Sequence, residues 1–158
     1  MTDLIKHDPL VASNFWLELD GATVSLLSEV SGLDLQIEVV ETKQTGQNGV
    51  YAPFKAMGQA KTAGELTVKR MAPLDIDGDP LWKWFNDIRD KGMVAKSRTA
   101  KRKNGSVVVY DASNAEIARW NFYNAWPSKI SSDSFSATST EPVSETVTLV
   151  MERLERKK

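Results

Sequence analysis

The sequence contains no cysteine and a single histidine, His7, among its 158 residues. Without cysteine the chain can form neither a disulfide scaffold nor a thiolate metal site, so packing has to stabilise the fold. His7 has no second histidine or cysteine with which to share a metal, and residues 1–13 read as an N-terminal tail. We therefore expect no metal ion and no catalysis by a serine–histidine pair.

Long apolar runs are also absent. No stretch approaches the roughly 20 consecutive apolar residues that span a bilayer, and the N-terminus lacks a basic start followed by an apolar run. These absences predict a protein without a membrane anchor that stays in the cytoplasm unless something else moves it. A chain of roughly 150 residues buries about 70% of its unfolded surface, so we expect residues 1–158 to form one domain.

An excess of charge of one sign is missing as well, with 20 basic against 21 acidic residues. This balance argues against a dedicated nucleic-acid-binding protein. The distribution is less even, because residues 96–103 (KSRTAKRK) hold five basic side chains: Lys96, Arg98, Lys101, Arg102 and Lys103. A solvated basic loop explains this cluster, and a nucleic-acid-binding module that uses it remains the alternative.

Motifs for catalysis or for cofactor binding are not found. The run DIDGD at residues 75–79 partly matches a calcium-binding loop, but Pro80 and Asn86 stand where an EF-hand needs glycine and glutamate. An acidic turn that leads into a helix N-terminus explains the same residues. With no Gly-rich phosphate loop and no paired catalytic acids, we predict that the protein is not an enzyme and needs no cofactor.

Alternating apolar and polar residues predict an antiparallel β-protein. Residues 33–39 place Leu33, Leu35, Ile37 and Val39 on one face, which is the pattern of a strand with one side on the core. Asp20-Gly21 predicts a hairpin between residues 14–20 and 23–30. The further strands are expected at residues 64–71, 106–111, 116–126 and 144–154, with residues 112–115 as a second hairpin turn. Pro127 predicts that the strand before it ends at Trp126.

One segment carries clear helix signals, and it spans residues 80–91. Asp79 can cap the helix, Pro80 suits its first position, and Gly92 can close it. A stripe at helical spacing predicts the buried face: Leu81, Trp84, Phe85 and Ile88. Trp82 lies outside this stripe, so it either covers the rim of the core or contacts another chain.

The segment from residue 42 to residue 64 is unusually long for a connection inside a compact domain. It contains four glycines and no acidic residue, and we expect it to be loose when the chain is alone. We interpret it as an inter-subunit arm that becomes ordered on an adjacent subunit. Its lysines would meet the carboxylates of the 75–79 turn. The expected interface residues are Lys43, Val50, Tyr51, Phe54, Lys55, Met57, Lys61, Asp75, Asp77 and Trp82.

Several short motifs, in one order and spacing, resemble the tail tube protein family of contractile phage tails and related contractile injection systems. They are SEVSGL, LWKW, NAWP at residues 124–127, and a closing E-T-x-x-L pattern at residues 145–149. The resemblance spans almost the whole chain. Two departures leave the exact loop path open: QTGQNGVYAPFKAMGQ replaces the Gly-Gly pair and Pro-Gly step that are common in relatives, and Met71 stands where a glycine commonly follows the basic pair.

The resemblance implies two packed antiparallel β-sheets that form a sandwich or barrel with one flanking helix. It further implies hexameric rings that stack into a hollow tube inside a sheath, with baseplate or spike and tail terminator proteins as further partners. The lumen would carry DNA or effector proteins, and the chain would be part of a phage tail or injection-system particle. A monomeric β-sandwich that binds a small ligand is the remaining alternative.

Overall fold

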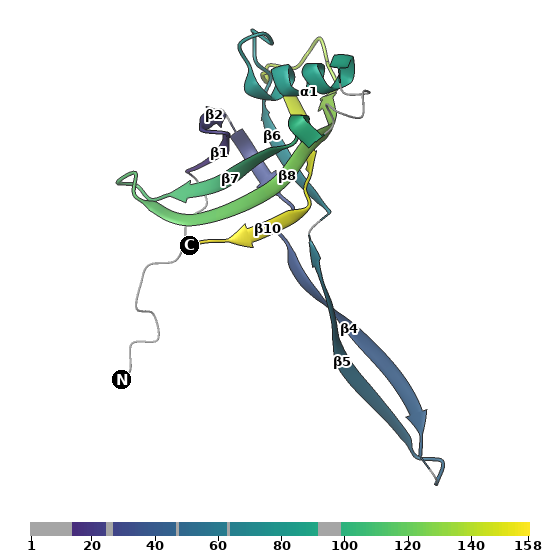
Figure 1. Cartoon of the computed structure of the whole chain (residues 1–158). Coiled ribbons are helices and arrows are strands. Elements are labelled where there is room, and N and C mark those ends of the chain that lie inside the picture. Colours follow the sequence, from purple (N-terminus) through teal and green to yellow (C-terminus); the bar gives the residue numbers. More distant parts are fainter. Residues whose placement is uncertain (1–13, 25–26, 47, 63, 92–98) are drawn as a thin grey trace, which may run out of the picture.

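The computed structural model describes residues 14–24, 27–46, 48–62, 64–91 and 99–158. These residues form a β-rich body from which a long two-stranded arm projects (Figure 1). The expected N-terminal tail, Gly92, and the cluster residues Lys96 and Arg98 lie outside the described residues. In chain order the elements are β1 (Phe15–Leu19), β2 (Ala22–Val24), β3 (Leu27–Ser31), β4 (Leu35–Thr45), β5 (Tyr51–Thr62), β6 (Glu65–Met71), α1 (Pro80–Lys91), the short 3₁₀ helix η1 (Thr99–Lys101), β7 (Lys103–Tyr110), β8 (Glu116–Ser132), β9 (Ser144–Val150) and β10 (Arg153–Arg156).

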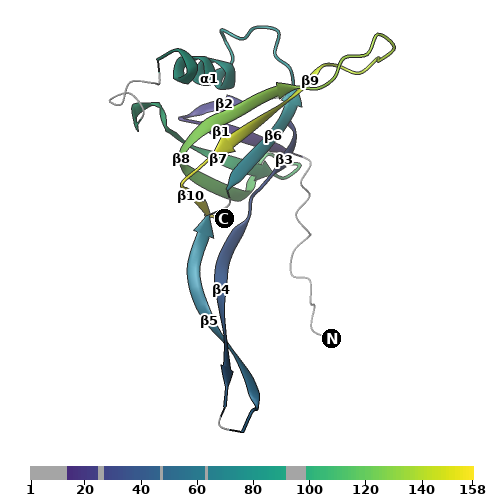
Figure 2. The ribbon, with the colours of Figure 1, turned by 90° about the vertical axis from the view of Figure 1, so that its right-hand side faces the viewer.

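The body consists of two antiparallel layers joined by the long strand β8. The order is β2-β1-β7-β8-β9-β6-β3, and β10 also pairs with β8. The first part of β8 pairs with β7 and β10, and its last part pairs with β9. Figure 2 shows β3, β6 and β9 in front of β1, β2 and β7. The predicted packing of two antiparallel sheets is therefore confirmed, and the two sheets are halves of one bent sheet.

Alternating side chains from the two layers fill the core. Leu66 and Val68 of β6 face Val147 and Leu149 of β9, and all four are fully buried. The buried apolar cluster is completed from the other layer and the helix by Leu17, Leu19, Val24, Leu81, Trp84, Val107, Phe122, Ala125, Met151 and Leu154. The strands predicted at residues 14–20 and 64–71, and the first part of the one predicted at residues 144–154, are present, and each buries one of its faces in this core.

The helix begins as its sequence predicts. The carboxylate of Asp79 accepts a hydrogen bond from the backbone N–H of Trp82 at 2.9 Å, which is a helix N-cap, and Pro80 is the first helical residue. Leu81 and Trp84 are buried on the stripe. The helix lies at the end of the body opposite to the arm (Figures 1 and 2).

Several boundaries differ from the prediction. The segment 144–154 is not one strand, because β9 ends at Val150 and β10 begins at Arg153 and pairs with another part of β8. The segment 23–30 is not one strand, because β2 pairs with β1 whereas β3 pairs with β6 in the other layer. In addition, β8 does not end at Trp126 but continues to Ser132. Pro127 is tolerated because β7 pairs with β8 only as far as Ala125, and because the register with β9 shifts between Pro127 and Lys129.

The arm leaves the body at a glycine. Gly32 has a φ of +89°, and a Cβ placed on it would lie 2.1 Å from the backbone oxygen of Glu65. Glu65 begins β6, where the chain returns from the arm. Only glycine fits both the backbone conformation and this close approach of two chain segments.

Candidate subunit interface

The segment predicted to be a loose connection is an extended β-hairpin. Strand β4 pairs with β5 from Leu35 opposite Thr62 to Thr45 opposite Tyr51. The segment expected to be loose is therefore ordered by its own backbone: β4 and β5 form a ladder, and the hairpin begins at Leu35 rather than at residue 42. In the described residues β4 and β5 pair only with each other and form a sheet separate from the body.

Local interactions and glycines explain the turn at the tip of the arm and the bulge in its middle. At the tip, the N–H of Gly46 donates to the carbonyl of Val50, and the N–H of Gly49, at a φ of +70°, donates to the carbonyl of Gly46. Farther down, the register shifts between Ile37 and Val39. Gly58 lies at this bulge, where a Cβ would lie 2.7 Å from the Cβ of Glu38. The sequence thus builds a bent, twisted hairpin rather than a flat one.

The pairing register divides the arm into two faces. We call one of them the apolar face, since it carries five large apolar side chains: Leu35, Ile37, Val39, Tyr51 and Met57. The pair formed by Glu41 and Lys55, together with Lys43, lies on the same face. The opposite face carries mostly polar or small residues, with Val40 and Phe54 as its large apolar side chains.

The apolar face lies open in the single chain. Leu35, Ile37 and Val39 are 59%, 58% and 67% exposed. Their predicted place in the core of the subunit is therefore wrong. The alternation does mark a strand with one apolar side, but that strand has left the body, and none of the residues that the structure describes covers it. An exposed apolar surface of this kind is typical of a site of association with another protein.

The predicted interface residues of the arm are all present on it and accessible. Tyr51, Phe54 and Met57 are exposed, as is Val50 near the tip. The ammonium group of Lys43 lies 5.9 Å from the centre of the Tyr51 ring. Lys61 forms an ion pair with Glu38 on the same arm, so it is already paired within its own chain.

The turn at residues 75–79 lies at the opposite end of the molecule. Asp75 and Asp77 are exposed, and the carboxylate of Asp75 accepts the N–H of Asp77 at 3.0 Å. Asp79 is buried and is bound within its own subunit. Of the three carboxylates in this turn, therefore, only Asp75 and Asp77 face solvent.

A buried ionic cluster holds the base of this turn. The guanidinium of Arg70 donates two hydrogen bonds of 2.6 Å to Asp79 and one of 2.7 Å to Glu145. Burial disfavours the charged guanidinium, but hydrogen bonds and charges from both carboxylates outweigh this and raise the pKa of Arg70. No local sequence pattern indicates this cluster, because Glu145 is distant from Arg70 and Asp79 along the chain.

Trp82 belongs to the same cluster. Its indole N–H donates to the carboxylate of Glu145 at 3.0 Å, and its ring packs edge-on against Phe85. Trp82 is half-buried. It covers the rim of the core, as one of the two sequence interpretations expected, and its contact with another chain stays a prediction.

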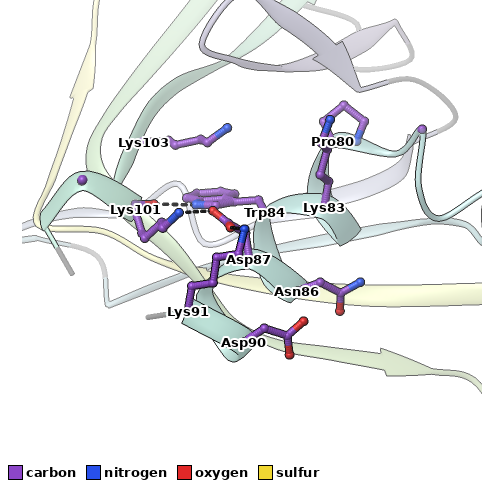
Figure 3. A pocket seen from close by; sticks show the side chains of 11 residues that line it. Pro80, Lys83, Trp84, Asn86, Asp87, Asp90, Lys91, Lys101 and Lys103 are labelled. Carbon is purple, nitrogen blue, oxygen red and sulfur yellow. Dashed lines mark hydrogen bonds and ion pairs between the residues drawn. The ribbon is translucent and has the colours of Figure 1, made fainter. Parts of the chain in front are cut away.

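A hollow with a volume of about 710 Å³ lies beside α1 (Figure 3). The indole N–H of Trp84 donates to the carbonyl of Lys101 at 2.6 Å, and the ammonium group of Lys101 binds Asp87. Lys103 lies 5.7 Å from the centre of the Trp84 ring. Asp87 pairs with both Lys91 and Lys101 in this hollow, which is typical of a structural ion-pair network.

The described part of the basic cluster is internally neutralised. Lys101 pairs with Asp87, and Arg102 pairs with Glu152 while its guanidinium lies 4.7 Å from the centre of the Trp126 ring. Lys103 lies 3.8 Å from Asp20. These contacts favour a structural role for the three residues over an open phosphate-binding patch.

Within the described ranges, no group of three or more histidine, cysteine, aspartate or glutamate side chains could hold a metal ion. No helix in that part of the chain is long and apolar enough to cross a membrane.

Comparisons with solved structures reveal the same fold in three assemblies and proteins. The anti-feeding prophage tube-terminating cap gives a TM-score of 0.77 at 23% identity, over 99% of this chain and 95% of that chain. The sheath–tube complex of the PVC extracellular contractile injection system gives a TM-score of 0.73 at 23% identity, over 94% of this chain and 91% of that chain. Hcp1 from Flavobacterium johnsoniae gives 0.51 at 17% identity, over 90% and 94%.

No curated protein matches the chain. A family model does match: the one described as T4-like virus tail tube protein gp19, over residues 11–155. This match covers nearly the whole chain and confirms the family resemblance of its motifs. The protein is thus a structural subunit of a tail tube, and the chain belongs to the T4-like virus tail tube protein family.

Proposed function

We propose that six copies of this chain form a ring, and that the rings stack into a hollow tube whose subunits are joined by the β4–β5 arm. The observation that carries the proposal is the arm itself: a paired hairpin that projects from the body with an uncovered apolar face. Such an exposed apolar surface is unusual for a soluble monomer and marks a site of interaction with another protein. A neighbouring subunit provides the cover.

Free strand edges support ring closure. Strands β2 and β3 end the sheet order of the body, so each presents an outer edge that no strand of the described residues covers. Exposed edges pair readily with other chains. Pairing between the edges of adjacent subunits would close a ring and would remove these edges at the same time.

The mechanism proposed for the assembled tube is passive. A surrounding sheath contracts and drives the tube through a target envelope, and the lumen carries DNA or effector proteins. Baseplate or spike proteins and a terminator protein would meet the two ends of the tube. The subunit would hydrolyse nothing, would be made in the cytoplasm, and would leave the cell as part of a tail or injection-system particle.

Removing the arm tests the proposal. The residues between Val39 and Met57, which face each other in the register, are replaced by Asn-Gly, a favoured two-residue hairpin turn. We expect a folded subunit by circular dichroism that no longer sediments as tubes and shows none in negative-stain images. The full-length chain is the control and should form tubes.

Two outcomes would favour the other functions. A full-length chain that stays monomeric at high concentration would favour a ligand-binding β-sandwich. Steeply salt-dependent DNA binding by single subunits would favour a nucleic-acid-binding module that uses residues 96–103. Normal tubes built from the shortened chain would show that the arm does not join the subunits.

A further inference from the structure

The end of the body that lies opposite to the arm carries a groove of about 600 Å³. Its walls are residues Thr23 and Val24 of β2, the end of β6, and the loop from residue 72 to residue 80. We infer that this groove receives the apolar face of the arm of a second copy of the chain. The inference rests on the proposed function and deepens it, because it assigns the surface that the arm occupies.

Like the apolar face of the arm, the groove and its rim expose large apolar side chains. Leu74 lines the groove and is fully exposed, and Met71 at the end of β6 is also exposed. Ile76 in the same loop and Val143 beside it expose further apolar surface. The backbone N–H of Ala72 donates to the carbonyl of Val143 at 2.8 Å, so the loop 72–80 lies beside the segment that leads into β9. Exposed apolar side chains gathered in this way are typical of a surface that binds another protein.

The loop is also held in place before anything binds. Arg70 and Asp79 flank it in sequence, and their two 2.6 Å hydrogen bonds close its base inside the protein. Within the loop, the carboxylate of Asp75 accepts the N–H of Asp77. A surface fixed in its binding conformation loses less conformational freedom when a partner arrives, which favours binding.

Charge complementarity points to the arm as the occupant. Asp75 and Asp77 give the loop two exposed negative charges. On the apolar face of the arm, Lys43 carries a positive charge and Lys55 lies opposite Glu41, so these three residues give this part of the face one net positive charge; beyond Glu41 the arm has no acidic residue. Apolar contact between the two surfaces would therefore be accompanied by opposite charges at its edge.

The geometry requires a second copy. The loop 72–80 that lines the groove lies at the end of the molecule opposite to the arm (Figures 1 and 2), so a chain cannot place its arm in its own groove. A contact between two different surfaces of identical chains is heterologous, and it repeats in one direction until something ends it. Stacked rings joined in this way would grow from one end to the other with one polarity.

Cross-linking tests the contact directly, because the chain contains no cysteine of its own. Tyr51→Cys on the apolar face and Leu74→Cys at the groove are introduced into separate chains, which are mixed, assembled and treated with a short bismaleimide. We expect a covalent dimer on a denaturing gel. Gln44→Cys on the opposite face of the arm is the matched control with Leu74→Cys, and it should give at least about tenfold less dimer. Equal yields, or no dimer from assembled tubes, would overturn the inference.

A charge exchange supplies a second readout. Lys43→Glu with Lys55→Glu places like charges against the loop, as does Asp75→Lys with Asp77→Lys, and each pair should lower the sedimentable fraction by about tenfold or more. A chain with all four changes should assemble again. Failure of the fourfold variant to recover while the unchanged chain forms tubes would overturn the groove assignment and leave the tube function standing. Absence of tubes from the unchanged chain would refute the tube function and the groove together.

Discussion

The guanidinium of Arg70 binds the carboxylate of Asp79 through two hydrogen bonds of 2.6 Å, and the same guanidinium also binds Glu145. The three residues come from the end of β6, the cap of α1 and the start of β9. Because Asp79 also caps the helix, one buried cluster fixes the helix, the sheet and the loop between them. Both carboxylates depend on a single cation for compensation of their charge.

Arg70→Leu should therefore destabilise the subunit strongly. The substitution leaves two buried carboxylates without their cation, and breaking a buried ion pair from one side costs about 3–5 kcal/mol. Lys69→Leu is the matched control, because the side chain of Lys69 is 42% exposed and pairs with Asp133 at 3.4 Å. Its loss should cost no more than about 1 kcal/mol. Urea titrations followed by tryptophan fluorescence measure both, and similar losses would contradict the assigned role of the cluster.

The two helix tryptophans should differ in the same assay. Trp84 is only 3% exposed, and its N–H is bonded to the carbonyl of Lys101. Trp84→Ala should cost about 3–5 kcal/mol. Trp82→Ala should cost less in the isolated chain, because its side chain is only half-buried. Equal losses would place Trp82 in the core as well.

Acid should weaken the fold below about pH 4. Hydrogen bonds lower the pKa of several carboxyl groups; for Asp111 the donors are the hydroxyl of Ser113 and the backbone N–H groups of Ala115 and Ser113. The others are Asp87, Glu116, Glu152 and Glu155. A carboxyl whose pKa is lower in the folded state stabilises the fold above its unfolded pKa of about 4. That stability is lost as the pH falls through the folded value.

The free energy of unfolding should therefore change little between about pH 8 and pH 5 and fall below about pH 4. Asp111→Asn removes one of the titrating groups, so its stability should fall less between pH 7 and pH 3 than that of the unchanged chain. Ser113→Ala should act in the same direction, because it removes the hydroxyl donor to Asp111. Chemical denaturation at a series of pH values measures the difference. An unaltered acid response in both variants would contradict the assignment.

Local sequence signals predicted most of the body. The helix was found because Asp79, Pro80 and the stripe at Leu81 and Trp84 act within one stretch of chain. The strands were found because alternation marks a strand with one buried side. The same signal misplaced Ile37 and Val39, since it shows that one side is apolar without showing which chain covers it.

The candidate interface was predicted only in part. Tyr51, Phe54 and Met57 were found as apolar residues in a long polar segment, but their neighbours on β4 were assigned to the core. Leu74 and the groove beside it were missed, because an exposed leucine in a loop has no local signature. The buried ionic cluster of Arg70, Asp79 and Glu145 was also missed, because only the fold brings Glu145 to the other two residues.

The glycine at the base of the arm gives a last prediction, with another glycine as its control. Gly21 and Gly32 both have positive φ, at +82° and +89°. A Cβ on Gly21 would meet nothing within 4 Å, whereas one on Gly32 would lie 2.1 Å from the backbone oxygen of Glu65. Gly21→Ala should therefore cost about 1 kcal/mol, which is the penalty of the backbone conformation alone.

Gly32→Ala should cost at least about 2 kcal/mol more than Gly21→Ala, because the backbone of Glu65 must shift to admit the methyl group. That shift occurs where the chain leaves the body after β3 and returns to it at β6, so the direction of the arm should change with it. We expect lower stability in urea and, at a temperature where the variant is still folded, fewer tubes by sedimentation. Equal stability of the two variants would show that the backbone of Glu65 can shift without a loss of stability. Gly32 would then not be one of the residues that determine the direction of the arm.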